Sequence, residues 1–254
     1  MTFADRSPII MQGKVFIQER SFNGAATSGL EWVGNADNAV LSFKQKRERI
    51  VDNYTGKGLT IASPVVETEL EFMLSMLDLS MSNLARASWG RWDGVEVAAS
   101  IAGESIVMYN DRYVQLAHSG VSNVVVAGAV LNTDYVIEAS GAGGLLRVLP
   151  GSTAAPAGTP LTTTVSYDTT ANNGKVEGFV TAQKFYSIVV NGINVAQGNQ
   201  PHILRIHQIQ LDAWKKADFI DKKQMKLESG GEILIDASIS DDGALSQVFS
   251  LRKG

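Results

Sequence analysis

The apolar residues of this chain occur in short runs rich in Val, Ile and Thr, and Gly, Asn, Asp or Pro separates one run from the next. Runs of this length and composition are typical of strands, and the separating residues are typical of turns. Helical and strand patterns do not alternate along the chain, which argues against a parallel α/β protein. The sequence therefore predicts an all-β sandwich or barrel with one short flanking helix. Its expected strands are Gly13–Gln18, Val40–Phe43, Val95–Ile101, Ser105–Tyr109, Val124–Leu131, Tyr135–Ala139, Leu161–Tyr167, Phe185–Val190, His202–Leu211 and Glu232–Ile239.

A further strand is predicted from Val65 to Met76, where apolar and polar residues follow an alternating pattern. The apolar residues also fit a helical stripe, but Glu67, Glu69 and Glu71 occur at a spacing of two, which places all three on one face only in a strand. We expect the opposite, apolar face to be fully committed to the core. The glutamates then form either a solvated sheet face or the wall of an aqueous channel, because neighbouring like charges favour water over a packed interface.

The short helix is predicted from Ser80 to Ser88, directly after this strand. Asp78 or Ser80 can cap its first turn, and Gly90 lies where a helix of this length ends. One or two further helical turns are predicted around Ala213–Phe219.

Composition excludes several classes of protein. The 254 residues carry a formal net charge of −4, which is opposite to the basic footprint of a protein that grips nucleic acid. The chain has no cysteine, so a disulfide scaffold, a thiolate metal site and a cysteine nucleophile are excluded. The longest apolar stretch, Val124–Leu131, is too short to cross a bilayer, and the first residues lack the pattern of a secretion signal. We expect a soluble protein made in a cytoplasm.

The motifs of catalysis and cofactor binding are incomplete. His202 and His207 lie five residues apart, on opposite faces of a predicted strand, where they cannot easily share a metal ion. The glycines of 141–144 lack the last glycine of a dinucleotide fingerprint, and Asp241–Gly243 is more typical of a β-turn than of a calcium loop. We therefore predict no catalytic, cofactor-binding or metal-binding residues and no enzymatic activity.

Two stretches are predicted to be long exposed loops. The first, from Lys44 to Gly58, carries five basic residues and two acidic ones. The second, from Gly151 to Pro160, consists of small residues and prolines and fits either a hairpin tip or the boundary of an insertion.

Read in order, these elements resemble the major tail tube protein of long, non-contractile bacteriophage tails, as found in siphophages. The resemblance lies in order and spacing rather than in one signature motif. The segments that carry it are Gly13–Ile17, Leu30–Gly34, Val40–Phe43 leading into the basic loop, the strand and helix over 65–88, Asn132–Ile137, Leu161–Tyr167, Val190–Asn194, Ile203–Leu211 and Gly230–Asp236.

The resemblance implies a single tail-tube domain over residues 1–254, and it leaves open an outer-surface insertion at about 95–174, the segment least like the family. It implies a structural subunit of stacked, hexameric rings whose acidic lumen conducts DNA during ejection, in a virion tail assembled in the host cytoplasm. The implied partners are ring neighbours, stacked rings and other tail proteins such as tape measure, terminator and distal tail proteins. DNA would pass transiently, and no membrane or cofactor is implied.

Two sets of residues acquire roles from the resemblance. Glu67, Glu69 and Glu71 would line the lumen, which suits a conduit because every Lys or Arg that contacts phosphate adds salt-dependent affinity for DNA. The long loop would contact the neighbouring ring through Lys44, Lys46, Arg47, Glu48, Arg49, Asp52, Tyr54 and Lys57.

A monomeric β-sandwich that binds carbohydrate or protein remains the alternative. It predicts a cluster of exposed aromatic side chains, for which Trp89, Arg91 and Trp92 are the candidates, although their position at the end of the helix favours packing. A hydrolase on a β scaffold stays open as a third class, because carboxylates from distant segments can meet in space.

Overall fold

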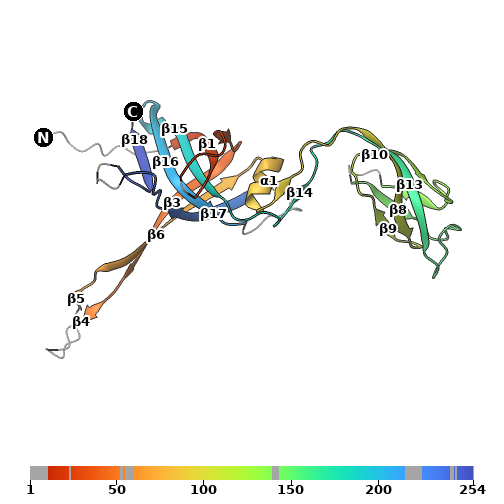
Figure 1. Ribbon diagram of the computed structural model, residues 1–254, viewed down its shortest axis with the longest axis horizontal. Helices are drawn as coiled ribbons and strands as arrows, with labels where there is room; N and C mark the ends of the chain where they lie inside the picture. The colour runs from red at the N-terminus through yellow and green to blue at the C-terminus, as the bar shows by residue number, and fades with distance from the viewer. Residues whose placement is uncertain are drawn as a thin grey trace. The chain divides into compact units, whose positions relative to one another are not determined.

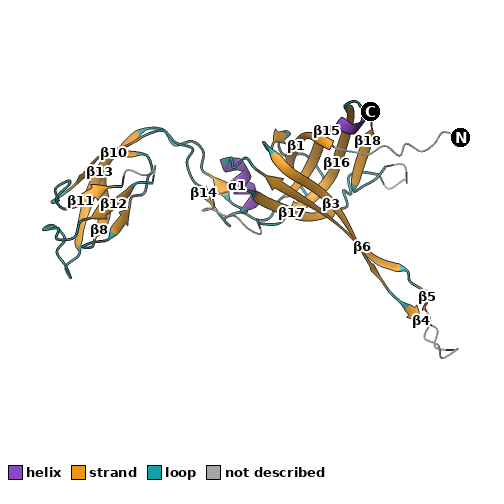
Figure 2. Ribbon diagram, turned by 180° about the vertical axis from the view of Figure 1, so that it is seen from behind, coloured by secondary structure: helices purple, strands orange, loops and turns teal. Residues whose placement is uncertain are grey.

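The computed structural model describes residues 11–22, 24–51, 54, 60–138, 143–214, 225–240, 243 and 245–253. Within them, nearly all regular structure is β-strand, with one α-helix and one 3-10 turn (Figure 2). The prediction of an all-β fold with one short helix is confirmed. No helix in this part of the chain is long and apolar enough to span a membrane.

The chain divides into two compact units. Unit 1 comprises Met1–Trp92 and Val176–Gly254, and unit 2 comprises Asp93–Lys175 (Figure 1). The segment at about 95–174, for which an insertion was left open, lies entirely inside unit 2. The structure thus contains two cores where one domain was expected.

Unit 1 is built on an eight-stranded antiparallel sheet of order β2-β1-β15-β16-β17-β6-β3, in which β18 also pairs with β16. β17 and β18 pair with different halves of β16, residues 208–211 and 202–206 respectively. The strands are β1 (Met11–Arg20), β2 (Glu31–Trp32), β3 (Ala36–Arg47), β6 (Val65–Met76), β15 (Phe185–Asn194), β16 (Gln200–Leu211), β17 (Leu227–Leu234) and β18 (Phe249–Lys253). Shorter elements are β4 (Ile50–Val51) with β5 (Thr60–Ala62), β7 (Arg91–Trp92) with β14 (Val176–Glu177), and the 3-10 turn Val195–Gln197.

Strands at both ends of this sheet contribute side chains to one buried core. Val15 and Ile17 of β1 belong to the same buried cluster as Phe72 and Leu74 of β6, and Leu41 of β3 packs against it. Alternate residues of each strand point inward, as period-two alternation predicts. The sheet therefore curls around its own core, and the outer face carries the polar residues of the same strands.

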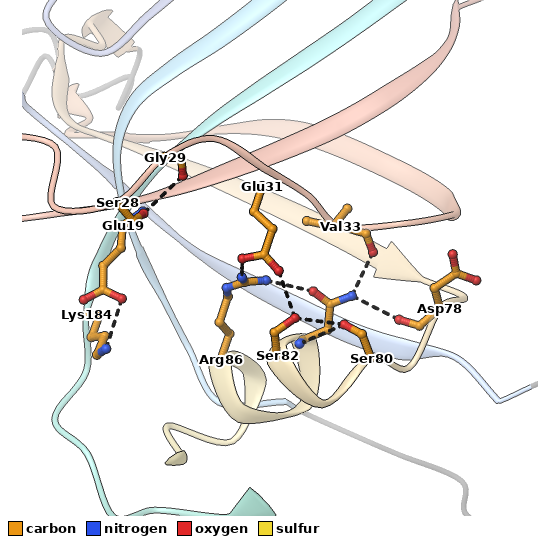
Figure 3. Close-up of polar contacts among 11 residues, drawn as sticks. Glu19, Ser28, Gly29, Glu31, Val33, Asp78, Ser80, Ser82, Arg86 and Lys184 are labelled. Atoms are coloured by element: carbon orange, nitrogen blue, oxygen red, sulfur yellow. Dashed lines mark hydrogen bonds and ion pairs between the residues drawn. The ribbon is translucent and has the colours of Figure 1, made fainter. Parts of the chain in front are cut away.

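The helix α1 (Met81–Ala87) is held to unit 1 by a polar network (Figure 3). Ser80 caps it as predicted, because its Oγ accepts a hydrogen bond from the Asn83 backbone N–H at 3.2 Å. The buried Asn83 amide donates to the carbonyl oxygens of Val33 (2.8 Å) and Asp78 (3.1 Å). Arg86 forms an ion pair with Glu31. These contacts satisfy the buried polar groups at the helix start, so the helix is fixed to the strand region before it.

A second polar contact joins the end of β1 to the segment after β17. Arg20 forms an ion pair with the nearly fully buried Asp236 at 2.6 Å. Burial alone would raise the pKa of Asp236, but hydrogen bonds from Ser238 and from Arg20 lower it overall.

Unit 2 packs two three-stranded antiparallel sheets, β10-β13-β8 and β11-β12-β9. Their strands are β8 (Ala99–Met108), β9 (Tyr113–Gln115), β10 (Val121–Val126), β11 (Tyr135–Ile137), β12 (Leu145–Val148) and β13 (Leu161–Thr169). The buried core of this unit includes Met108, Leu146 and Val165. The sequence predicted separate strands at 95–101 and 105–109. The structure instead has one continuous strand, β8, which runs from Ala99 to Met108.

Asp134 and Tyr135 fasten the loops of unit 2. Asp134 accepts hydrogen bonds from the backbone N–H of Val130 (2.9 Å) and of Ala154 (3.1 Å) and from the Ser152 hydroxyl (2.8 Å), which hold its pKa well below the usual range. The Tyr135 hydroxyl donates to the carbonyl oxygen of Val124 at 3.0 Å. One carboxylate therefore ties the 150–155 segment to the loop before β11.

Candidate assembly surface

The candidate functional site is the ribbon that β3 and β6 form where they leave the sheet of unit 1. β6 pairs with β3 along its whole length, from Met76 opposite Ala36 to Val65 opposite Arg47. It pairs with β17 only from Met76 to Glu71. Beyond Glu71 the two strands continue as an isolated ribbon toward β4 and β5 (Figure 1).

The glutamate face of this ribbon is the one that the sequence predicts, on the side of β6 away from Phe72, Leu74 and Met76. The strands place Lys46 opposite Glu67 and Lys44 opposite Glu69. Lys46 Nζ lies 3.3 Å from Glu67 Oε2, and Lys44 forms an ion pair with Glu71 on the diagonal. The hydrogen bond to Glu71 raises the pKa of the Lys44 ammonium. The glutamates are therefore partly neutralised by lysines of the neighbouring strand.

The prediction that Lys44–Gly58 is one long loop is wrong for its first part. Lys44, Lys46 and Arg47 lie in β3. The two lysines are accommodated because the facing positions of β6 carry glutamates, whereas Arg47 ends the strand opposite Val65.

Past Arg47 the chain remains hairpin-like. The Glu48 N–H donates to the Pro64 carbonyl oxygen (3.1 Å), and Arg49 Nε donates to the Thr60 hydroxyl (2.5 Å) before β4 pairs with β5. Tyr54 is exposed. Asp52 and Lys57, which the sequence also assigned to this contact, lie outside the described residues.

The core-side face of the ribbon is only partly covered, contrary to expectation. Phe72 and Leu74 are buried, whereas Val66 is 54% exposed and Phe43, on the facing strand, is 57% exposed. Phe43 contacts the ring of Phe249 edge-on, with ring centroids 6.0 Å apart. The apolar face loses its cover where β17 stops pairing with β6, at Glu71. β3 and β6 continue to pair with each other beyond that point, up to Val65.

An acidic depression lies beside the base of the ribbon, with a volume of about 270 Å³. It is lined by four carboxylates, from Glu69, Glu71, Asp212 and Glu232. Glu232 of β17 lies directly opposite Glu71 of β6. Sequence reasoning missed Asp212 and Glu232: the alternation around Glu232 predicts its face, but no local signal shows that β17 pairs with β6.

One histidine and one tryptophan that the sequence singled out, His202 and Trp89, pack inside unit 1. His202 is buried in β16, with its Nδ1 3.1 Å from the Gln200 carbonyl oxygen. Trp89 Nε1 donates to the Leu211 carbonyl oxygen (3.0 Å), and its ring packs edge-on against Phe179. Trp92 is 40% exposed, and Trp89, Arg91 and Trp92 line one depression of unit 1 with a volume of about 240 Å³. Among the residues that the structure describes, no group of His, Asp and Glu is arranged to hold a metal ion.

The family model described as "Protein of unknown function UCP028589" matches residues 8–252, and the chain belongs to this family. The match spans both units. A search of curated proteins found no match.

Proposed function

We propose that this member of the UCP028589 family is a structural subunit of a phage tail tube, in which subunits form rings and stacked rings form a conduit for DNA. The observation that carries the proposal is the β3–β6 ribbon, which extends past the core of unit 1 with its apolar face only partly covered. The ring number of six and the virion location come from the sequence resemblance.

The ribbon is suited to self-association. A two-stranded hairpin without further cover is marginally stable in water, and exposed apolar residues on such a hairpin mark a contact surface. Phe43 and Val66 supply that apolar surface, and Lys44 and Lys46 with their glutamate partners supply charge on the other face. A neighbouring copy of the chain is the partner that would cover it in every subunit of a ring or stack.

The end strand of the sheet supports the same proposal. β3 is twelve residues long and is the last strand of the sheet order, so its outer edge presents backbone groups that can pair with another chain. Closed rings remove such edges by pairing them between copies. The charged residues near its end, Lys44 to Arg47, would limit pairing with unrelated chains.

The acidic face suits a DNA conduit. The region around this face carries five carboxylates and only the two lysines of the ribbon, so negative charge is in excess. The carboxylates are those of Glu67, Glu69, Glu71, Asp212 and Glu232. We place Glu67, Glu69 and Glu71 at the lumen, where an excess of negative charge lets phosphate pass with little binding. A structural subunit of this kind has no turnover of its own.

Two measurements test the proposal. Negative-stain microscopy of the purified chain is expected to show rings or tubes, and dispersed single particles at all concentrations would refute it. The second uses a shortened ribbon in which Asn-Gly joins Lys46 directly to Glu67, the pair that faces each other across the hairpin. This variant should keep the circular dichroism and melting temperature of unit 1 but form no tubes, and normal tubes would show that the ribbon is not the assembly contact.

A further inference from the structure

Unit 2 contains an open groove of about 660 Å³ that has no part in the proposed tube contacts. Two tyrosines that bracket the turn between β8 and β9 lie on it, Tyr109 and Tyr113, with 54% and 53% of their surfaces exposed. Its volume is in the range of small-ligand sites. The groove lies within unit 2, so its ligand does not depend on whether unit 1 forms tubes.

The tyrosines are held by a tight turn. The Arg112 N–H donates to the Tyr109 carbonyl oxygen (3.2 Å), and Asp111 between them has a positive φ of 52°. The Asn110 side chain donates to the Ala155 carbonyl oxygen at 2.9 Å. Both ends of the turn are thus fixed, and little conformational entropy would be lost when a ligand contacts the rings.

The facing wall is also a constrained turn. The Thr159 N–H donates to the Pro156 carbonyl oxygen at 3.0 Å, with Gly158 at a φ of 82°, and Pro160 follows. The segment just before this turn is the one that Asp134 ties down through three consecutive residues. The groove therefore has two rigid walls in the free protein.

The polar side chains on the groove include strong hydrogen-bond donors. Among the described residues, the Arg112 side chain makes no hydrogen bond or ion pair, and it lines the groove beside the two phenol groups. Arg147 stacks on the Tyr113 ring, with its guanidinium 5.6 Å from the ring centroid, and lies 3.5 Å from Asp111. Arg147 thereby contacts the Tyr113 ring without lining the groove.

The residues that line the groove indicate the class of ligand. They belong to the two turns, over 109–113 and 156–160, and they include no Leu, Ile, Val, Met or Phe. A peptide anchored by a Leu, Ile or Phe side chain would find no aliphatic pocket in this groove. A sugar ring offers C–H faces that stack on an aromatic ring and hydroxyl groups that bond to donors at its rim. From this combination we propose that the groove between Tyr109, Tyr113 and the 156–160 turn is a saccharide-binding site.

Saturation-transfer NMR on the full chain tests this site. The probes are hexamers of α-1,4-glucose, β-1,4-glucose, N-acetylglucosamine and galacturonic acid, with a tryptic peptide mixture measured under the same conditions. At least one hexamer should bind with a millimolar Kd. Tyr109→Ala and Tyr113→Ala should each weaken that binding at least tenfold, whereas the Phe substitutions, which keep the ring, should weaken it less than threefold. Val125→Ala is the matched control, because Val125 is exposed on the same unit but does not line the groove.

Three outcomes would overturn the proposal. The first is that none of the four hexamers binds the wild-type chain. The second is that the alanine variants, with melting temperatures equal to that of Val125→Ala, bind as tightly as the wild type. The third is transfer to peptides but not to any hexamer, which would make the groove a peptide site.

Discussion

Phe43→Ala should strongly impair tube formation while leaving the subunit folded. With 57% of Phe43 exposed, assembly can cover about 110 Å² of a side chain that presents about 200 Å². At about 25 cal/mol per Å² this area is worth about 3 kcal/mol, and about 2 kcal/mol per contact is lost once the area that Ala retains is subtracted. The association constant of one subunit contact should therefore fall by about 30-fold.

Phe22→Ala provides the control for this substitution. Phe22 is 68% exposed and also rests on a single aromatic ring, that of Phe185 at a centroid distance of 5.3 Å. It lies in the turn after β1, away from the ribbon. Both substitutions should lower the melting temperature of unit 1 by a similar small amount, because each removes one partly exposed aromatic contact.

The assay is the critical concentration for polymerisation, measured by pelleting and checked by negative-stain microscopy. Phe43→Ala should raise it at least tenfold, and Phe22→Ala should leave it within twofold of the wild type. Equal effects of the two variants, or tubes of Phe43→Ala at the wild-type concentration, would refute the assignment of the ribbon as the contact surface.

Three further predictions concern charge, the helix anchor and pH. Replacing Glu67, Glu69 and Glu71 together with Gln should make assembled tubes retain DNA in filter binding, because the ribbon lysines then lack their carboxylate partners. This retention should fall as the salt concentration rises. If the variant retains no more DNA than the wild type, these residues do not line the lumen. Asn83→Ala should lower the free energy of unfolding by about 2–3 kcal/mol, since two backbone carbonyls lose a buried donor, and calorimetry with no shift in Tm would contradict that role. The pKa of Asp236 is lowered on folding, so this carboxylate stabilises the folded state above its unfolded pKa of about 4. That stabilisation is lost as the pH falls through the folded pKa. Asp236→Asn should therefore flatten the acid dependence of the free energy of unfolding measured in urea titrations.

Local signals in the sequence predicted the elements whose stability is local. Alternation over 65–76 identified β6 and the face that carries its glutamates, and Ser80 identified the start of α1, because an N-cap hydrogen bond joins residues only three apart. The all-β class followed from the same short runs. These inferences need no knowledge of which strand lies beside which.

The lysines of β3 show where local reasoning ends. Lys44, Lys46 and Arg47 disfavour a strand when read alone, since Lys is depleted in strands. The residues that face Lys44 and Lys46 on β6 are Glu69 and Glu67, which are more than twenty positions away in sequence and supply the opposite charges. Arg47 faces the apolar Val65 beyond a register shift. The strand exists because of these cross-strand pairs, which local propensity does not contain.

The sequence by itself determined that β6 has two chemically different faces, and only the tertiary structure decided how much of each is covered. The alternation of β6 is the same before and after Glu71, yet the strand is buried on its apolar side only where β17, more than 150 residues later, lies beside it. In the same way, Tyr109 and Tyr113 flank a turn between two strands, and they line a groove only because the 156–160 turn lies across from them. Side-chain direction follows from the backbone period within a few residues, but burial depends on which distant segments pack alongside, and that is set by the fold as a whole.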